Sequence, residues 1–183
     1  ISQYDKAYLD NLMRYSRVLL QRNKLLKDIA DGNEKGMGVI EALDMQLTAL
    51  SALIHKARTA FVDEFLPVFN SHFANISGGN ETVGLTYESH LHQPDFDQLL
   101  KQTFKRDLAL GYTTKGIHKD DLEFMLDGHP LKKEGSQGQK KSFVISLKLA
   151  QFDFLARHQG IKPILLLDDI FDKLDQQRGN SLL

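Results

Sequence analysis

The fold class of this chain is decided by the stretch Pro163-Ile164-Leu165-Leu166-Leu167-Asp168-Asp169. A continuous apolar run of this length is typical of a strand that is buried on both faces of an α/β sheet. Ligands of such sheets bind beyond the carboxyl ends of the strands, which is where Asp168 and Asp169 are predicted to lie. One or two carboxylates suit a magnesium ion that also contacts phosphate oxygens. The alternative is that the two residues only end the strand and cap the next turn.

A polar loop, Gly135-Ser136-Gln137-Gly138-Gln139, precedes a predicted helix that continues to about His158. Ser136 and Gln139 have the spacing of a capping box, and this structural role is sufficient for the serine. It does not account for Gly138, because glycine is unfavourable in a first helical turn. A glycine here suits the close approach of phosphate oxygens to the amides of a helix N-terminus. The chain contains no G-x-x-x-x-G-K-S/T loop.

The first 78 residues are predicted to form a helical hairpin. Residues 4–30 have an apolar stripe at helical spacing, and residues 43–61 hold a heptad register. The intervening residues 31–38 contain three glycines and are expected to form the turn between the helices. Pro67 is predicted to kink or end the second helix.

Alternation with a period of two predicts a strand over residues 83–87. Pro94 is expected to open a helix whose apolar positions extend to Leu108. Residues 127–129, Asp-Gly-His, are flanked by apolar positions and are interpreted as the turn of a hairpin.

Composition limits the possible classes. The chain has a net charge of −1 and no cysteine, so disulfides and thiolate metal sites are excluded. No apolar run approaches the roughly 20 residues that cross a bilayer, so we expect no transmembrane helix. Residues 1–30 carry six basic and three acidic residues, an excess that permits phosphate contact but is also common on solvated helices. Because residue 1 is Ile rather than Met, we expect a piece of a longer chain.

The order and spacing of three motifs resemble those of ABC-type ATPases. Ser136–Gln139 lies 28 residues before Ile164–Asp169, and Lys173-Leu174-Asp175 follows. They correspond to the signature loop, the Walker B strand and the D-loop. Within that superfamily the chain is most similar to the RecF family, which carries Ser-Gln-Gly-Gln in the signature loop and Asp-Asp after the strand.

Two further segments resemble RecF. Gly111-Tyr112-Thr113-Thr114-Lys115-Gly116-Ile117-His118-Lys119-Asp120-Asp121-Leu122 is similar to the RecF segment G-x-T-x-x-G-P-H-R-D-D-L. Ile117 and Lys119 depart from the family's Pro and Arg, and Lys does not replace the contacts of Arg. Tyr8, Leu12, Tyr15 and Gln21-Arg22-Asn23 are similar to the RecF arm.

The resemblance implies a role for each matching residue. Asp168 would hold Mg²⁺, and Asp169 would orient the attacking water. Ser136, Gln137, Gly138 and Gln139 would contact the γ-phosphate of ATP bound to the opposite protomer, and Asp175 would lie at the dimer interface. His118 either contacts phosphate or caps a loop. Weak DNA contacts are expected from Arg14, Arg17, Lys101, Lys105 and Arg106.

The resemblance also implies a fold and an activity. The fold would be α/β, with a helical-hairpin arm (1–78) joined to an incomplete ABC-type ATPase lobe (79–183) that has a mainly parallel core sheet. The whole protein would be a cytoplasmic, slow, DNA-dependent ATPase that dimerises with ATP. It would bind junctions of single-stranded and duplex DNA and help to load recombinase with RecR and RecO partners. The piece without a phosphate-gripping loop would be inactive alone. The alternatives are another SMC-like ABC repair ATPase and a non-catalytic interaction module.

Overall fold

The computed structural model describes residues 1–32, 36–79, 81–92, 95–160 and 163–165. These residues divide into two compact units. Unit 1 comprises residues 1–59 and 88–121, and unit 2 comprises residues 60–87 together with the described residues from 122 onward. The boundary between residues 59 and 60 falls inside one long helix, Met37–Ser77, whereas the sequence predicted a division at residue 78. The predicted division stays a prediction.

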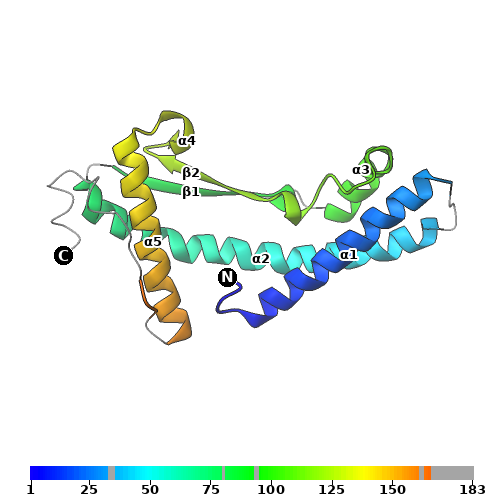
Figure 1. The fold of residues 1–183 in the computed structure, drawn as a ribbon, viewed down its shortest axis with the longest axis horizontal. Helices are drawn as coiled ribbons and strands as arrows, with labels where there is room; N and C mark the ends of the chain where they lie inside the picture. The colour runs from blue at the N-terminus through cyan, green and yellow to red at the C-terminus, as the bar shows by residue number, and fades with distance from the viewer. Residues whose placement is uncertain (33–35, 80, 93–94, 161–162, 166–183) are drawn as a thin grey trace. The chain divides into compact units, whose positions relative to one another are not determined.

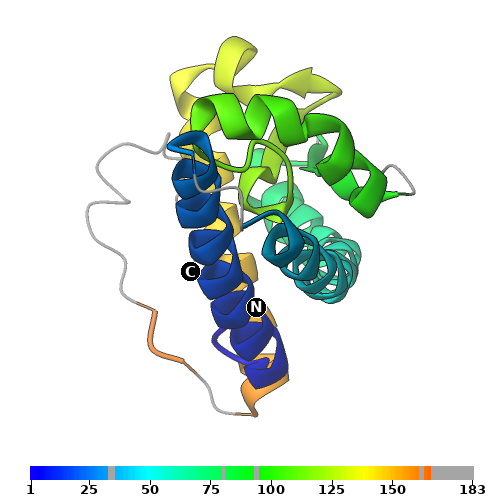
Figure 2. The ribbon, with the colours of Figure 1, turned by 90° about the vertical axis from the view of Figure 1, so that its right-hand side faces the viewer.

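Unit 1 is built from a pair of antiparallel helices and a third helix (Figure 1). Helix α1, Lys6–Ala30, begins after Asp5, whose carboxylate accepts a hydrogen bond from the Tyr8 amide. It is followed by α2, Met37–Ser77, of which residues 37–59 belong to this unit. Helix α3, Phe96–Leu110, packs against α1 (Figure 2). The two predicted helices of the hairpin are therefore present.

The core of unit 1 follows the predicted stripes. Its buried residues come from α1, α2, α3 and the short 3-10 helix η3, Ile117–Lys119. They are Tyr8, Tyr15, Val18, Leu43, Leu47, Leu50, Ile54, Phe96, Leu100 and Ile117. A second 3-10 turn, η2, spans His90–His92.

Unit 2 combines a small sheet with the second half of α2 and helix α5, Gln137–Gln159. Aromatic rings of the two helices form its core; the Phe69 and Phe143 centroids lie 4.8 Å apart in an edge-to-face arrangement. Helix α2 continues ten residues beyond Pro67, so the prediction that this proline could end the helix is wrong.

The sheet has the order β1-β2-β3, with β1 at Val83–Glu88, β2 at Asp121–Leu126 and β3 at His129–Pro130. Strands β2 and β3 are antiparallel, and Asp127 and Gly128 form their two-residue turn with φ angles of 49° and 80°. Positive φ at both positions matches the hairpin turn expected here. The short helix α4, Leu131–Glu134, follows directly. The α/β class is thus confirmed, whereas a mainly parallel sheet is not: the described strands give an antiparallel arrangement.

Helix α2 corrects the expectation that no segment suits a membrane. By length and composition, Met37–Ser77 is long and apolar enough to cross a bilayer. Core helices of other proteins meet the same criterion. Here Ile40, Leu43 and Leu47, at helical spacing, are buried within unit 1, so part of the apolar character of α2 serves packing.

Candidate functional site

The predicted signature loop forms the N-terminus of α5. Ser136 Oγ accepts a hydrogen bond from the Gln139 amide at 3.2 Å, and Gln139 Oε1 accepts one from the Ser136 amide at 2.8 Å. This reciprocal pair is the predicted capping box. The side chain of Gln139 is also fixed from the other side, since its Nε2 donates to Glu81 Oε1 at 2.6 Å. These hydrogen bonds set the position of the loop within unit 2.

The first turn of α5 begins at the surface of unit 2. Three consecutive residues here are exposed: Ser136, Gln137 and Gly138. A helix leaves its first amides without intrahelical acceptors, and Ser136 caps only that of Gln139. The amides of Gln137 and Gly138 are the ones that remain for an outside acceptor. Together with the positive end of the helix dipole, they suit an anion such as a phosphate oxygen.

The turn into α5 depends on a glycine. A Cβ at Gly135 would lie 2.8 Å from the backbone oxygen of Leu131 and 2.7 Å from its Cδ1. Real Cβ contacts are essentially never that short, and the backbone oxygen cannot move aside as a flexible side chain can. Gly135 therefore sets the direction in which the Ser136 loop leaves α4.

The acidic half of the predicted site lies outside the described residues. Asp168, Asp169 and Asp175 belong to that part of the chain. Of the apolar run before them, residues 163–165 are described; they are not in a strand, and Ile164 is 89% exposed. The meeting of the serine loop with the acidic pair, and the magnesium site at Asp168, stay predictions.

The segment Gly111–Leu122 is anchored by Arg22, one of the six basic residues among residues 1–30. Arg22 is fully buried. Its Nη1 donates to Asp107 Oδ2 at 2.8 Å and to Thr113 Oγ1 at 2.9 Å, and its Nε donates to Asp44 Oδ1 at 2.5 Å. Burial raises the pKa of Asp44 above its usual value, and the Arg22 charge opposes this rise. Arg22 thus joins three helices and a loop and is not available to phosphate.

The same segment is held at two further points. Thr113 donates both its amide and its hydroxyl to Asn23 Oδ1, at 2.8 and 2.7 Å. The guanidinium of Arg58 donates to the Ile117 carbonyl oxygen at 2.8 Å and to Asp120 Oδ2 at 2.5 Å. Most of the residues that make this segment resemble RecF therefore have structural partners within unit 1.

His118 is held through both of its ring nitrogens. Nε2 lies 3.0 Å from the Thr113 carbonyl oxygen, which can only accept, so Nε2 is the donor. Nδ1, 2.7 Å from Tyr15 Oη, then accepts from the phenol. Burial lowers the pKa of His118 and raises that of Tyr15. This geometry is that of a loop cap; a phosphate contact by His118 stays a prediction.

The five predicted DNA contacts all lie on exposed helix surfaces. Arg14 and Arg17 are exposed on α1, and Lys105 and Arg106 are exposed on α3. Lys101 is exposed too, but its ammonium forms an ion pair with Asp97 at 2.6 Å. Their contact with DNA stays a prediction.

Comparison with known proteins was made by sequence and by structure. No protein-family profile matches the chain. The DNA replication and repair protein RecF of Flavobacterium johnsoniae is 51% identical over 178 residues, which are 97% of this chain and 50% of that protein. RecF of a Bacteroides fragilis strain is 49% identical over 183 residues, covering all of this chain and 49% of the relative. The chain belongs to the RecF family.

Solved RecF structures agree with this assignment. The recombination mediator RecF-ATP of the RecFOR pathway superposes with a TM-score of 0.90 at 29% identity, covering all of this chain and 51% of that one. RecF-ATPrS gives a TM-score of 0.86 at 29% identity, over 96% of this chain and 49% of that one. The chain spans about half the length of the RecF proteins it matches.

Sequence reasoning missed several residues that shape the RecF segment described here. Arg58 and Glu81 were not singled out, because their partners Asp120 and Gln139 are 62 and 58 residues away. Arg22 was seen as part of the RecF resemblance, but its burial was not foreseen. Its place on the apolar side of α1, four residues before the buried Leu26, was the available signal.

Proposed function

We propose that this chain is part of a RecF protein that acts in DNA replication and repair and binds ATP between two protomers. The observation that carries the proposal is the exposed first turn of α5, where Gln137 and Gly138 offer backbone amides beside a fixed capping box. The similarity to RecF proteins, including the solved structures of RecF-ATP and RecF-ATPrS, supports it.

In this proposal each ATP contacts two molecules. The phosphate-gripping loop, which this sequence does not contain, would come from one protomer, and Ser136–Gln139 of the other would contact the γ-phosphate. Transfer of a phosphoryl group needs positioning and neutralisation of charge rather than covalent chemistry by the protein. The helix N-terminus supplies both through backbone amides and dipole. ATP then holds the dimer together, and hydrolysis releases it.

The acidic residues complete the proposed site. Asp168 would hold Mg²⁺, which would neutralise phosphate charge, and Asp169 would orient the attacking water. Asp175 would lie beside the nucleotide at the dimer interface. An Asp at position 169 reaches less far than the Glu of most relatives in the superfamily, which fits slow hydrolysis.

The proposed partners are DNA at single-strand gaps and the RecR and RecO proteins of the same pathway. Arg14 and Arg17 on α1, with Lys105 and Arg106 on α3, are the exposed cations in unit 1 that we assign to phosphate contacts. Such contacts are sensitive to salt and largely independent of sequence. They suit a protein that recognises a DNA junction rather than a base sequence.

The test is the substitution Ser136→Arg in the intact protein. A bulky cation at this position removes the cap and fills the space that the γ-phosphate would occupy. We expect ATP-dependent dimerisation, measured by analytical ultracentrifugation, to be lost while monomers still bind ATP. Gln151→Arg, an exposed position on the same helix, is the matched control and should dimerise normally. Normal dimerisation of the Ser136 variant would contradict the proposed contact across protomers.

A further inference from the structure

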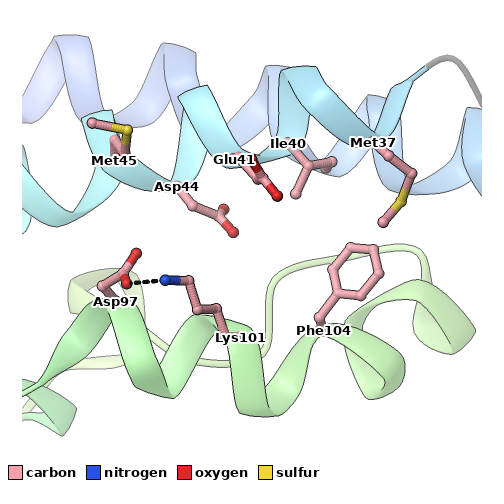
Figure 3. A pocket seen from close by; sticks show the side chains of 8 residues that line it. All are labelled: Met37, Ile40, Glu41, Asp44, Met45, Asp97, Lys101 and Phe104. Atoms are coloured by element: carbon pink, nitrogen blue, oxygen red, sulfur yellow. Dashed lines mark hydrogen bonds and ion pairs between the residues drawn. The ribbon is translucent and has the colours of Figure 1, made fainter.

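Unit 1 contains a groove between the first turns of α2 and the helix α3. It has a volume of about 420 Å³ (Figure 3). Five of its lining residues come from α2 and three from α3: Met37, Ile40, Glu41, Asp44 and Met45, and Asp97, Lys101 and Phe104. None of them belongs to the proposed nucleotide site.

The groove is acidic. Three carboxylates, those of Glu41, Asp44 and Asp97, face a single ammonium group, that of Lys101 (Figure 3). The buried Arg22 does not make the groove neutral, because its single positive charge is shared between two carboxylates, those of Asp44 and Asp107. Phosphate groups are repelled from such a surface, whereas a Lys or Arg side chain is attracted to it.

The groove is also lined with adaptable apolar side chains. Met37 and Met45 are 48% and 70% exposed and stand on its α2 wall, while Phe104 rises from α3 (Figure 3). Methionine side chains are flexible and polarisable, and they are common on surfaces that receive apolar anchors of protein partners. Exposing two of them beside carboxylates favours a ligand that is itself both apolar and cationic.

We propose that this groove is a docking site for a protein segment that carries an apolar side chain next to a Lys or Arg. The apolar side chain inserts between Met37 and Phe104, which face each other at one end of the groove (Figure 3). The cation pairs with Glu41 at the exposed rim, and it competes with Lys101 for Asp97. Arg14, Arg17, Lys105 and Arg106, the cations assigned to DNA, do not line this groove, and the fifth predicted contact, Lys101, is paired there with Asp97.

Methionine methyl NMR provides a site-resolved test in the intact protein. The probe is a short amphipathic helical peptide of leucine and lysine, and a leucine–glutamate peptide is its counterpart. We expect the leucine–lysine peptide to shift the methyl resonances of Met37 and Met45. Met13, 44% exposed on α1, and Met125 in unit 2 do not line the groove and should not shift. Equal shifts at Met13, or equal binding of the two peptides, would overturn the proposal.

Charge-reversing substitutions distinguish binding of the peptide in the groove from its general attraction to acidic surface residues. Glu41→Lys should weaken binding of the leucine–lysine peptide by about tenfold, as expected for the loss of a close charge pair. Asp10→Lys makes the same change at an exposed position of α1 outside the groove and should leave the affinity within about twofold of the unmodified protein. Both variants must keep the circular dichroism spectrum of the parent. The proposal is wrong if the two substitutions weaken binding equally or if neither does.

Discussion

Substitution of Arg22 by Ala should strongly destabilise unit 1. The arginine is completely buried and donates to two carboxylates, Asp44 and Asp107, and to the Thr113 hydroxyl. Without it, both carboxylates stay buried with no opposing charge. Removal of one partner from a buried ion pair costs about 3–5 kcal/mol, and two carboxylates place this site at the upper part of that range.

The change can be measured by hydrogen exchange of the amides in α1 and α3. Because each 1.4 kcal/mol is a factor of ten, we expect their exchange to accelerate by about three to three and a half powers of ten, up to the limit set by global unfolding. Arg17→Ala, at an exposed position of the same helix, should change the free energy of opening by no more than about 0.5 kcal/mol.

The loss should also depend on pH in a defined direction. The pKa of Asp44 is already raised by burial, and it rises further when the opposing charge of Arg22 is removed. A carboxyl group whose pKa is raised in the folded state favours folding when it is protonated. The destabilisation should therefore be largest at neutral pH and shrink as pH falls through the raised pKa of Asp44. If Arg22→Ala costs no more than Arg17→Ala, or if its cost does not vary with pH, the network is not what stabilises unit 1.

Two further predictions concern the segment that Arg22 anchors. Gly116→Ala should lower the free energy of unfolding by about 2–3 kcal/mol, because φ is +134° and the new Cβ would lie 2.7 Å from Tyr15 Oη. Thermal unfolding measures this loss. The control is Gly38→Ala, in helix α2 with open space around the new Cβ, which should be neutral or stabilising. The imidazole of His118 should titrate below its ordinary pKa of 6.5 in an NMR pH series, because burial disfavours the charged ring. Since the folded-state pKa is lower than the unfolded one, His118 should weaken folding as pH falls from 6.5 through its depressed pKa. Titration at or above 6.5 would show that burial does not outweigh the hydrogen bond to the Thr113 carbonyl, which favours the charged ring.

Local patterns predicted most of the secondary structure because the signals for it are local. The heptad stripe of α2, the alternation of β1 and the Asp127-Gly128 turn each depend on residues close in sequence. The capping box of α5 was predicted for the same reason, since Ser136 and Gln139 are three residues apart. The prediction that Pro67 could end the helix was wrong because a proline inside a long helix can be tolerated when packing holds both halves, here through Phe65 and Phe69. A kink at Pro67 stays a prediction.

The candidate site was only partly accessible to sequence reasoning. The position of the signature loop on a helix N-terminus followed from its letters, but the Gln139–Glu81 contact that fixes it did not. The basic residues of α1 show the difference most clearly: Arg14 and Arg22 have the same side chain, yet one is exposed and the other fully buried. Charge counting treats them alike, because a composition contains no information about partners.

The sequence by itself determined the helices, the hairpin turn, the capping box of α5 and the family to which the chain belongs. Each of these depends on neighbours along the chain or on motifs in a fixed order. Only the tertiary structure decided which polar residues are structural, since Arg22 meets its partners 22 to 91 residues away and Arg58 meets its carboxylate 62 residues away. Burial makes those charges costly unless they are paired, so the fold, and not the residue type, assigns Arg22 to the core and leaves Arg14 at the surface.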